Sequence, residues 1–412
     1  MKNLSYTFHV VYNNLLIGST IIDQKIKDNQ PLQLGEFMLN LTFDTIIESS
    51  FGTKLNTQLN NVNNTGITST TATKSSGTLN NNEIGALYMH HQDIFLRIIA
   101  ANLMNPFKKY IFWSSDHKKV KESREFKYKM AEYLYENYKK QHSSDEVESD
   151  TSIMGHLYRN KYKDNIDRYS DMLVFISAGH ETTSWTIVWL LLALAKHPEV
   201  KKKLQLELDA CIPSRHGSST ESSTSSSSVN ATTTASAPNN NTTTDTSSET
   251  PSFPTISTLS SLPYLSMCIK ETMRLHPVAA SGPRRVTSED MYVTTNTHTT
   301  TTFIPKGSTI QVPLYSMFRS DWIIKSDEFI PERWDKENTD YNQQYKEIKE
   351  MFIPFSTGKR NCIGQNLANI ELLIIASYMI RYYDFKLISE PEIELFLTFK
   401  AQNVLMQVSH RD

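Results

Sequence analysis

The chain has 412 residues, of which 39% are hydrophobic and 21% charged, and its formal net charge at pH 7 is −2. This length suffices for one large domain or two ordinary ones, and the balanced charge argues against a nucleic-acid-binding protein. The three cysteines form no CxxC pair, so we expect no disulfide framework and a reducing, intracellular compartment. The first residues lack a charged segment followed by an apolar run, and no apolar run near them is long enough to span a bilayer, so we expect neither a signal peptide nor a membrane anchor in this sequence.

The first part of the sequence predicts helices separated by one polar tract. Apolar residues recur at helical spacing in Tyr6–Asp28 and in Leu34–Phe51, and Gly52 is a plausible C-cap for the second helix. Residues 56–82 are rich in Asn, Thr and Ser, a composition that predicts a disordered, low-complexity insert. The ordered stretch Glu83–Tyr110 predicts one helix that ends before Pro106, and Lys118–Lys140 predicts a charged amphipathic helix, followed by an acidic loop at Ser143–Ser152.

Asp164–His197 predicts one long helix whose second half is apolar on every face. A membrane span is the alternative, because Met172–Ala195 is nearly long enough. His180 and Glu181 lie at the centre of this stretch, where charge is costly in lipid. We therefore favour a buried core helix, followed by a second helix that begins at Pro198.

The second part of the sequence changes from helices to short strands. Residues 214–252 form another Ser/Thr/Asn tract that predicts disorder, and Leu262–His276 predicts a helix. Phe329–Trp334 suggests irregular structure. Short strands are expected at Val278–Val286, Met291–Thr295, Thr302–Val312 around residues 305–307, Phe385–Leu387, Leu395–Phe399 and Val404–Val408, the last two being joined by residues 400–403. The fold class is therefore mainly α with small β-sheets.

Cys362 ends a glycine-punctuated loop just before an apolar segment, Leu367–Ile380, that predicts a buried helix. Backbone N–H groups and the positive end of a helix dipole stabilise a thiolate at such a place. Gly358 allows a turn with positive φ, and Gly364 allows the backbone to approach the sulfur closely. The alternative is that a lone cysteine is simply a small buried hydrophobe.

Five positions of this loop together resemble the haem-binding loop of cytochromes P450: Phe355, Gly358, Arg360, Cys362 and Gly364. The resemblance implies a cytochrome P450 fold with haem as cofactor and the Cys362 thiolate as its iron ligand. It also implies that Arg360 pairs with a haem propionate and that Phe355 packs beside the sulfur.

A second resemblance joins residues that are distant in sequence. Glu271 and Arg274 lie three apart on a predicted helix, and Arg333 follows in Pro331–Trp334. By itself such a pair could be an exposed ion pair of little energetic weight. In this order the three residues resemble the structural Glu–Arg–Arg network of the same family.

The segment at residues 178–183 lies in the middle of the long predicted helix. Glycine inside a helix costs about 1 kcal/mol relative to alanine, so Gly179 suggests a site, although a helix cap or a core threonine would also explain the segment. In the family, the groove at Ala178 and Gly179 holds dioxygen. Glu181 and Thr182 match the acid–alcohol pair that supplies protons during oxygen activation.

Arg285 matches the family position that meets a haem propionate, although Arg284 is an adjacent competitor and either could be solvated. Val278–Gly282 and Ala401–Val404 match segments that line the substrate cavity. The resemblance thus implies a haem-thiolate monooxygenase that inserts one atom of O2 into a small apolar organic substrate. Its electrons would come from NADPH through a P450 reductase that docks near Lys359 and Arg360.

Two alternatives remain. A haem-thiolate isomerase or dehydratase has the same fold, but the intact Glu181–Thr182 pair argues against it. A catalytically impaired or inactive remnant is suggested because no segment ahead of Tyr6 resembles the family's anchor, first sheet and first helices. We expect a cytosolic location or one peripheral to the endoplasmic reticulum membrane. We divide the chain into P450-like regions at residues 1–55, 83–213 and 253–412, with inserts at 56–82 and 214–252.

Overall fold

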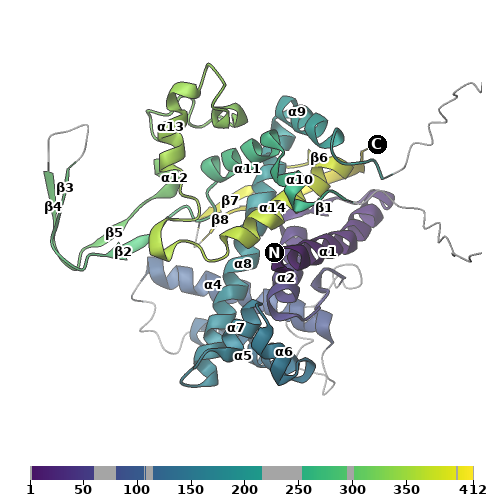
Figure 1. Ribbon diagram of the computed structural model, residues 1–412, viewed down its shortest axis with the longest axis vertical. Coiled ribbons are helices and arrows are strands. Elements are labelled where there is room, and N and C mark those ends of the chain that lie inside the picture. The colour runs from purple at the N-terminus through teal and green to yellow at the C-terminus, as the bar shows by residue number, and fades with distance from the viewer. Residues whose placement is uncertain are drawn as a thin grey trace, which may run out of the picture.

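The computed structural model describes residues 2–59, 80–105, 107, 115–215, 253–294, 301–395 and 398–411 (Figure 1). The longer helices are α1 (Lys2–Lys27), α2 (Leu34–Phe51), α4 (Asn81–Met104), α5 (Ser115–Gln141), α8 (Asn165–Lys196), α9 (Pro198–Asp209), α11 (Pro263–Leu275), α13 (Asn342–Met351) and α14 (Gln365–Tyr382). Shorter helical segments are η1 (Thr57–Leu59), α6 (Ser144–Ser149), α7 (Ile153–Arg159), α10 (Ile256–Ser260), α12 (Leu314–Met317), η3 (Pro331–Trp334) and η4 (Gly358–Arg360).

The strands are short and lie mostly in the C-terminal third. They are β1 (Leu32–Gln33), β2 (Arg284–Val286), β3 (Met291–Thr294), β4 (Thr301–Ile304), β5 (Thr309–Gln311), β6 (Tyr383–Leu387), β7 (Glu392–Leu395), β8 (Phe399–Gln402) and β9 (Leu405–His410). All pairings among them are antiparallel: β1–β9–β6 form one sheet, and β2–β5, β3–β4 and β7–β8 form two-stranded ribbons. The β3–β4 ribbon projects from the body of the molecule (Figure 1).

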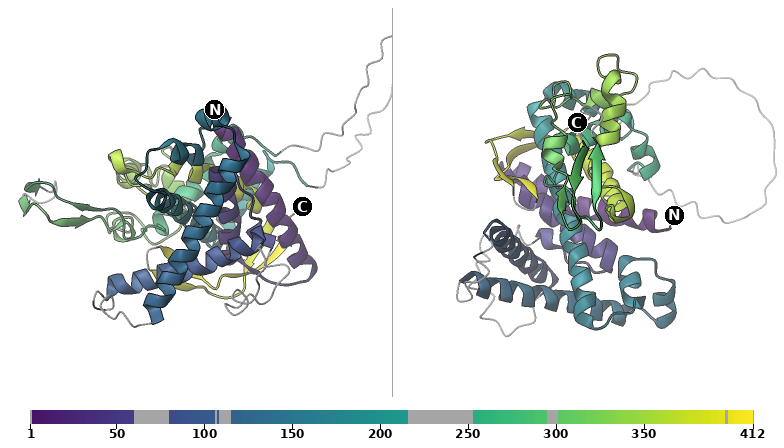
Figure 2. Two further views of the ribbon diagram at one scale, coloured as in Figure 1. Left: turned by 90° about the horizontal axis from the view of Figure 1, so that it is seen from below. Right: turned by 90° about the vertical axis from the view of Figure 1, so that its left-hand side faces the viewer.

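Helix α8 is the element around which the others are arranged (Figure 2). It begins where the side chain of Asp164 accepts a hydrogen bond from the Asp167 N–H at 2.9 Å, an N-cap interaction. Its second half, from Thr183 to Leu194, is buried on all faces, and α2, α5, α11 and α14 pack against it. The predicted long core helix is confirmed. No described helix has the length and apolarity to cross a membrane.

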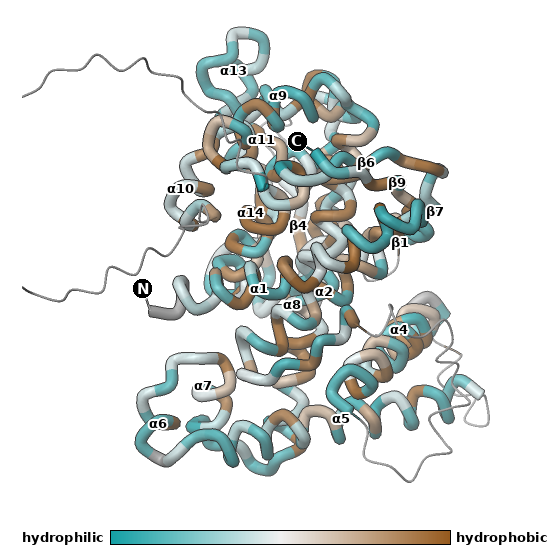
Figure 3. Tube along the Cα trace, turned by 90° about the vertical axis from the view of Figure 1, so that its right-hand side faces the viewer, coloured by the Kyte–Doolittle hydropathy of each residue, from teal (hydrophilic) through white to brown (hydrophobic). Residues whose placement is uncertain are grey.

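Among the described residues, the apolar core has two large parts, one at each end of α8, and a small separate cluster of Ile323, Trp334 and Ile348. The larger part joins the C-terminal half of α8 to α1, α11, α14 and the sheet that contains β6 and β9. The smaller part joins the N-terminal half of α8 to the second half of α2, to α5 and to α7. The apolar residues follow these inner helices, whereas hydrophilic residues dominate the outer helices such as α13 (Figure 3). Helix α2 takes part in both cores, which explains why it is buried along almost its whole length.

Several predicted elements differ from the structure. The expected acidic loop at Ser143–Ser152 contains helix α6, because Ser143 and Glu146 form a capping box that starts it. Helices α7 and α13 were not expected, and the predicted irregular segment Phe329–Trp334 includes the 3₁₀ turn η3. The expected strand Val278–Val286 is reduced to β2, since Gly282 turns the chain with φ +65°. A Cβ at Gly282 would meet the Val312 carbonyl oxygen at 1.8 Å, so the turn is possible only with glycine.

The strand boundaries near the C-terminus were also wrong. Strand β8 occupies residues 399–402, although residues 400–403 were expected to connect two strands. The expected strand Leu395–Phe399 is not formed as such: Leu395 is the last residue of β7, and Phe399 is the first residue of β8. The chain turns instead at Asn403, which has φ +58°. Asparagine tolerates this left-handed conformation better than most residues.

The two polar tracts lie largely outside the described residues. Within the first tract, however, residues 56–59 belong to the folded structure. The backbone N–H groups of Thr57 and Gln58 donate to the buried carboxylate of Asp44 at 2.8 and 3.1 Å. At the other end of the tract, Asn80 caps α4, and the first two residues of this helix had also been assigned to the tract. The insert is therefore shorter than predicted at both ends. The division of the chain into regions otherwise stays a prediction.

Candidate functional site

The Cys362 loop is shaped by two residues with positive φ, Ser356 at +61° and Gly358 at +77°. The value at Gly358 agrees with the predicted turn. The Cys362 N–H donates to the Phe355 carbonyl at 2.9 Å and closes the loop. Gly364 is the N-cap of α14, so the cysteine lies just before the helix as predicted. A Cβ at Gly364 would lie 3.9 Å from the Cys362 sulfur, an ordinary contact, so packing within the chain does not require glycine there.

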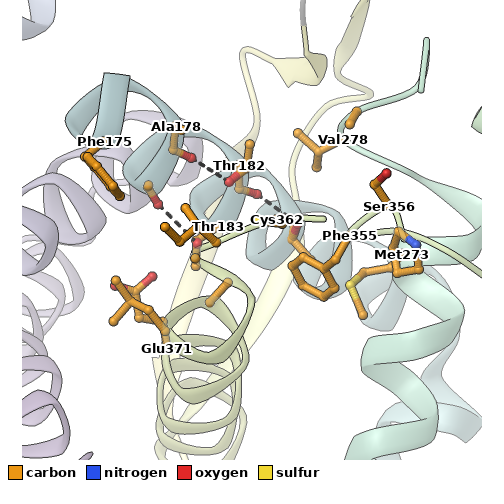
Figure 4. Close-up of a pocket in the computed structure, with 18 of the residues that line it drawn as sticks. Phe175, Ala178, Thr182, Thr183, Met273, Val278, Phe355, Ser356, Cys362 and Glu371 are labelled. Atoms are coloured by element: carbon orange, nitrogen blue, oxygen red, sulfur yellow. Dashed lines mark hydrogen bonds between the residues drawn. The ribbon is translucent and has the colours of Figure 1, made fainter. Parts of the chain in front are cut away.

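This loop forms one wall of a cavity of about 650 Å³ (Figure 4). Helix α8 forms the opposite wall, α14 closes the end next to the cysteine, and residues 277–283 form a third side. The side chain of Cys362 is exposed rather than buried, which excludes the alternative of a small core hydrophobe. The predicted site residues that line this cavity are Ala178, Gly179, Thr182, Arg285, Phe355, Arg360, Cys362 and Gly364.

The α8 wall presents a row of threonines. Their hydroxyls donate to backbone carbonyls one turn earlier: Thr182 to Ala178 at 2.8 Å, Thr183 to Gly179 at 3.2 Å, and Thr186 to Thr182 at 2.8 Å. Figure 4 shows Thr182 and Thr183 at the cavity. Because each hydroxyl proton is used within the helix, the hydroxyl oxygens remain free to accept hydrogen bonds from an occupant.

Gly179 also has a packing reason. A Cβ at this position would lie 2.8 Å from the Cδ1 atom of Ile46 on α2. The glycine therefore allows α2 and α8 to approach each other closely at the cavity. From the sequence, we inferred a functional site because glycine is unfavourable inside a helix. Close packing of α2 against α8 is a separate reason for glycine at this position.

Glu181 does not line the cavity, although it adjoins Thr182 in sequence. Its side chain is buried and forms an ion pair with Lys400 on β8, and it accepts a hydrogen bond from the Thr398 hydroxyl at 3.2 Å. A second buried cation, Lys127 on α5, interacts electrostatically with Glu181; burial lowers the pKa of Lys127 to about 8. The structure thus places the carboxyl and hydroxyl groups of the predicted acid–alcohol pair on different sides of α8.

The structure distinguishes the two neighbouring arginines of β2. Arg285 lines the cavity, whereas the guanidinium of Arg284 donates to the Gln311 side chain at 3.1 Å on the paired strand. Arg360 lines the cavity from the cysteine loop. Both cavity-lining arginines are exposed, so they place positive charge at the rim of an apolar cavity without being buried in it.

Glu371 on α14 is a cavity residue that the sequence reasoning missed. It is 1% exposed, and no described group completes a hydrogen bond to either of its carboxyl oxygens. The nearby Thr183 hydroxyl donates instead to the Gly179 carbonyl. Burial raises the pKa of Glu371 from its usual 4.5 to about 8. An acidic residue within the apolar run Leu367–Ile380 was the signal that could have identified it.

Away from the cavity, Glu271, Arg274 and Arg333 meet at sites with no solvent exposure. The Glu271 carboxylate accepts two hydrogen bonds from Arg274, both at 2.9 Å, and one from Arg333 at 2.8 Å. It accepts two more, from the Trp334 indole N–H at 2.9 Å and the Ile330 N–H at 3.0 Å. The structure therefore brings together the three predicted members and adds Trp334 to them.

Comparison with known proteins decides the family. The family model described as "Cytochrome P450" matches residues 19–227 and 244–410. The chain belongs to the cytochrome P450 family. Among curated relatives, cytochrome P450 3A12 from Canis lupus familiaris is 28% identical over 254 residues, which cover 60% of this chain and 41% of that protein. Cytochrome P450 3A6 from Oryctolagus cuniculus is 29% identical over 239 residues, which cover 58% of this chain and 38% of the relative. The matched part thus spans about two fifths of the length of these relatives.

Membership of the P450 family implies haem iron with an axial thiolate, and the cavity residues fit that group. The cavity offers one accessible thiol, Cys362, and apolar contacts that include Phe355, Leu367 and Leu372. At the rim, Arg285 and Arg360 carry the positive charges that would be needed to pair with the two propionate carboxylates of a haem. The arrangement suits a flat apolar molecule that meets a thiolate on one face and α8 on the other.

Proposed function

We propose that this P450 is a haem-thiolate monooxygenase that inserts one atom of O2 into a small apolar organic molecule. The observation that carries the proposal is the Cys362 thiol at an apolar cavity whose opposite wall is the threonine row of α8. Haem held by this thiolate would supply the oxygen-activating chemistry, and the chain would supply binding, orientation and protons. NADPH would supply the electrons through a P450 reductase.

The rim residues have separate roles in this proposal. Arg285 and Arg360 would pair with the haem propionates, and Phe355 would pack beside the sulfur. Thr182 would place its hydroxyl oxygen at the distal side, where it can accept and pass on a proton. Glu181 would reach that hydroxyl only by leaving Lys400, since its carboxylate now forms an ion pair behind the wall. Lys359 and Arg360 are exposed beside the cysteine and would attract an acidic reductase surface.

The first test concerns the thiolate. The reduced protein with bound carbon monoxide should show the red-shifted Soret band of thiolate-ligated haem, and Cys362→Ala should abolish that band. Cys211→Ala is the matched control, because Cys211 is another free cysteine but does not line the cavity. Persistence of the band in Cys362→Ala would show that another group ligates the iron.

The second test concerns the reaction class. With NADPH, a P450 reductase and isotopically labelled O2, products from a panel of apolar test compounds should gain one labelled oxygen atom. Rearrangement of an organic peroxide without O2 or NADPH would indicate an isomerase or dehydratase instead. A protein that shows the Soret band but neither activity would be the inactive remnant.

A further inference from the structure

Glu371 is a buried acid in the cavity wall, and neither of its carboxyl oxygens has a hydrogen-bond partner among the described residues. Its carboxyl lies beneath Thr183, between α14 and α8 (Figure 4). Its closest companions on α14 that also line the cavity, Leu367, Ala368 and Leu372, are apolar. An acid in such surroundings is costly to ionise, because burial without a cation removes hydration that nothing replaces.

No described charged group offsets an ionised Glu371. Helices α1, α8, α9, α10 and α11 and strand β6 pack against α14, and none of their described residues forms an ion pair or a hydrogen bond with the Glu371 carboxyl. The titratable and charged groups that share the cavity are His156 on α7, Arg285 on β2, and Arg360 and Cys362 in the loop, and none of them forms an ion pair or hydrogen bond with Glu371. Glu371 is therefore mostly an uncharged carboxylic acid at neutral pH.

We propose that Glu371 couples occupancy of the cavity to protonation: a flat apolar occupant binds with Glu371 as an uncharged acid. An apolar occupant displaces water from the cavity and so makes the surroundings of the already buried carboxyl less polar, which further disfavours the charged form. As an uncharged acid, Glu371 can donate its O–H to the Thr183 hydroxyl oxygen or to a water molecule, and no buried charge remains. If Glu371 is ionised when the occupant binds, then either Glu371 must take up one proton or an unpaired negative charge is buried.

The coupling has a definite sign and size. Below about pH 8 the acid is already protonated, so binding should not depend on it. Above that value each further pH unit should weaken binding, by up to about tenfold, because one proton must be taken up. A variant with an uncharged residue at this position should lack the dependence.

The probe for the test is metal-free protoporphyrin IX, whose binding is measured by its fluorescence. It has the shape that the proposed function requires but no iron. Failure of Cys362 to act as an iron ligand would therefore not affect the result. From about pH 6.5 to about pH 9.5, the dissociation constant of the wild-type protein should rise about tenfold or more relative to that of Glu371→Gln. Glu371→Met provides a second uncharged variant, and Glu392→Gln, on an exposed strand, is the matched control.

An infrared measurement tests the protonation state directly. Wild-type protein near neutral pH should show a carboxylic-acid C=O band that is absent from Glu371→Gln and that disappears as the pH rises through about 8. The proposal is overturned if this difference band is missing. It is also overturned if wild-type protein and both uncharged variants bind the porphyrin with the same pH dependence, or if the wild-type protein does not bind it at any pH.

Discussion

Replacing Glu271 by alanine should be among the most destabilising single changes in this protein. The side chain accepts five hydrogen bonds, and its two arginine partners have no solvent exposure. Without the carboxylate, two guanidinium charges remain buried with no anion to offset them. Such an uncompensated charge is the main cost of breaking a buried ion pair.

The magnitude depends on how many partners the arginines keep. Arg274 would still donate to the backbone carbonyls of Phe318, Ser326 and Glu328, and Arg333 to those of Ile324 and Lys325. These contacts satisfy hydrogen-bond donors of the two arginines, but neutral carbonyl groups do not neutralise the buried positive charges. The loss should therefore be about 3–5 kcal/mol, the range for breaking a buried pair. That is a large part of a typical total stability of about 5–15 kcal/mol.

Chemical denaturation followed by circular dichroism measures this loss. The matched control is Glu136→Ala on α5, because Glu136 and Lys139 have the same spacing of three residues on a helix but are exposed to solvent. Glu136→Ala should cost a small fraction of the loss at Glu271, since water already solvates both charges. If Glu271→Ala lowers the unfolding free energy no more than Glu136→Ala, the reasoning from buried charge is refuted.

Two further predictions concern the polar tracts and Glu371. Deleting residues 60–79 and 216–252 should move the thermal unfolding transition by only a few degrees, because their composition lacks core-forming residues; loss of soluble expression would contradict this. Glu371→Gln should gain stability over the wild type as the pH rises from about 4.5 to about 8, and the gain should level off above that range. The acid is protonated more readily in the folded protein, so its ionisation favours unfolding by up to roughly 3–5 kcal/mol. A stability difference between the two proteins that does not change with pH would contradict this assignment.

The sequence predicted the long helices well because each has a strong local signal. Helix α8 has an N-cap at Asp164, an apolar surface on all sides, and Pro198 at the start of the next helix. The strands were predicted less well, because three- or four-residue ribbons contain too few residues to show alternation. Their limits depend on distant contacts, such as the approach of Gly282 to the Val312 carbonyl.

The site was predicted where a motif is local and less well where side-chain direction matters. The Cys362 loop is one continuous segment, and Phe355, Arg360, Cys362 and Gly364 line one cavity, while their roles stay predictions. Glu181 and Thr182 are adjacent on a helix, and adjacent helical residues point about 100° apart, so adjacency in sequence does not make them neighbours at the cavity. Lys400, 219 positions later in the chain, determines which way Glu181 points.

Glu181 and Glu371 show how one protein can give two buried carboxyls opposite electrostatic roles. Lys400 and Thr398 satisfy Glu181, which is therefore held as an ion pair outside the cavity. Glu371 has no described cation to pair with, so the low cost of staying protonated keeps it uncharged within the cavity wall. A buried lysine next to Glu371 would favour its charged form, whereas loss of Lys400 would still leave Glu181 with the Thr398 hydroxyl and the electrostatic interaction with Lys127. The cations beside Glu181, and the lack of any such partner among the described groups at Glu371, thus distinguish two buried carboxyls of the same chemical type.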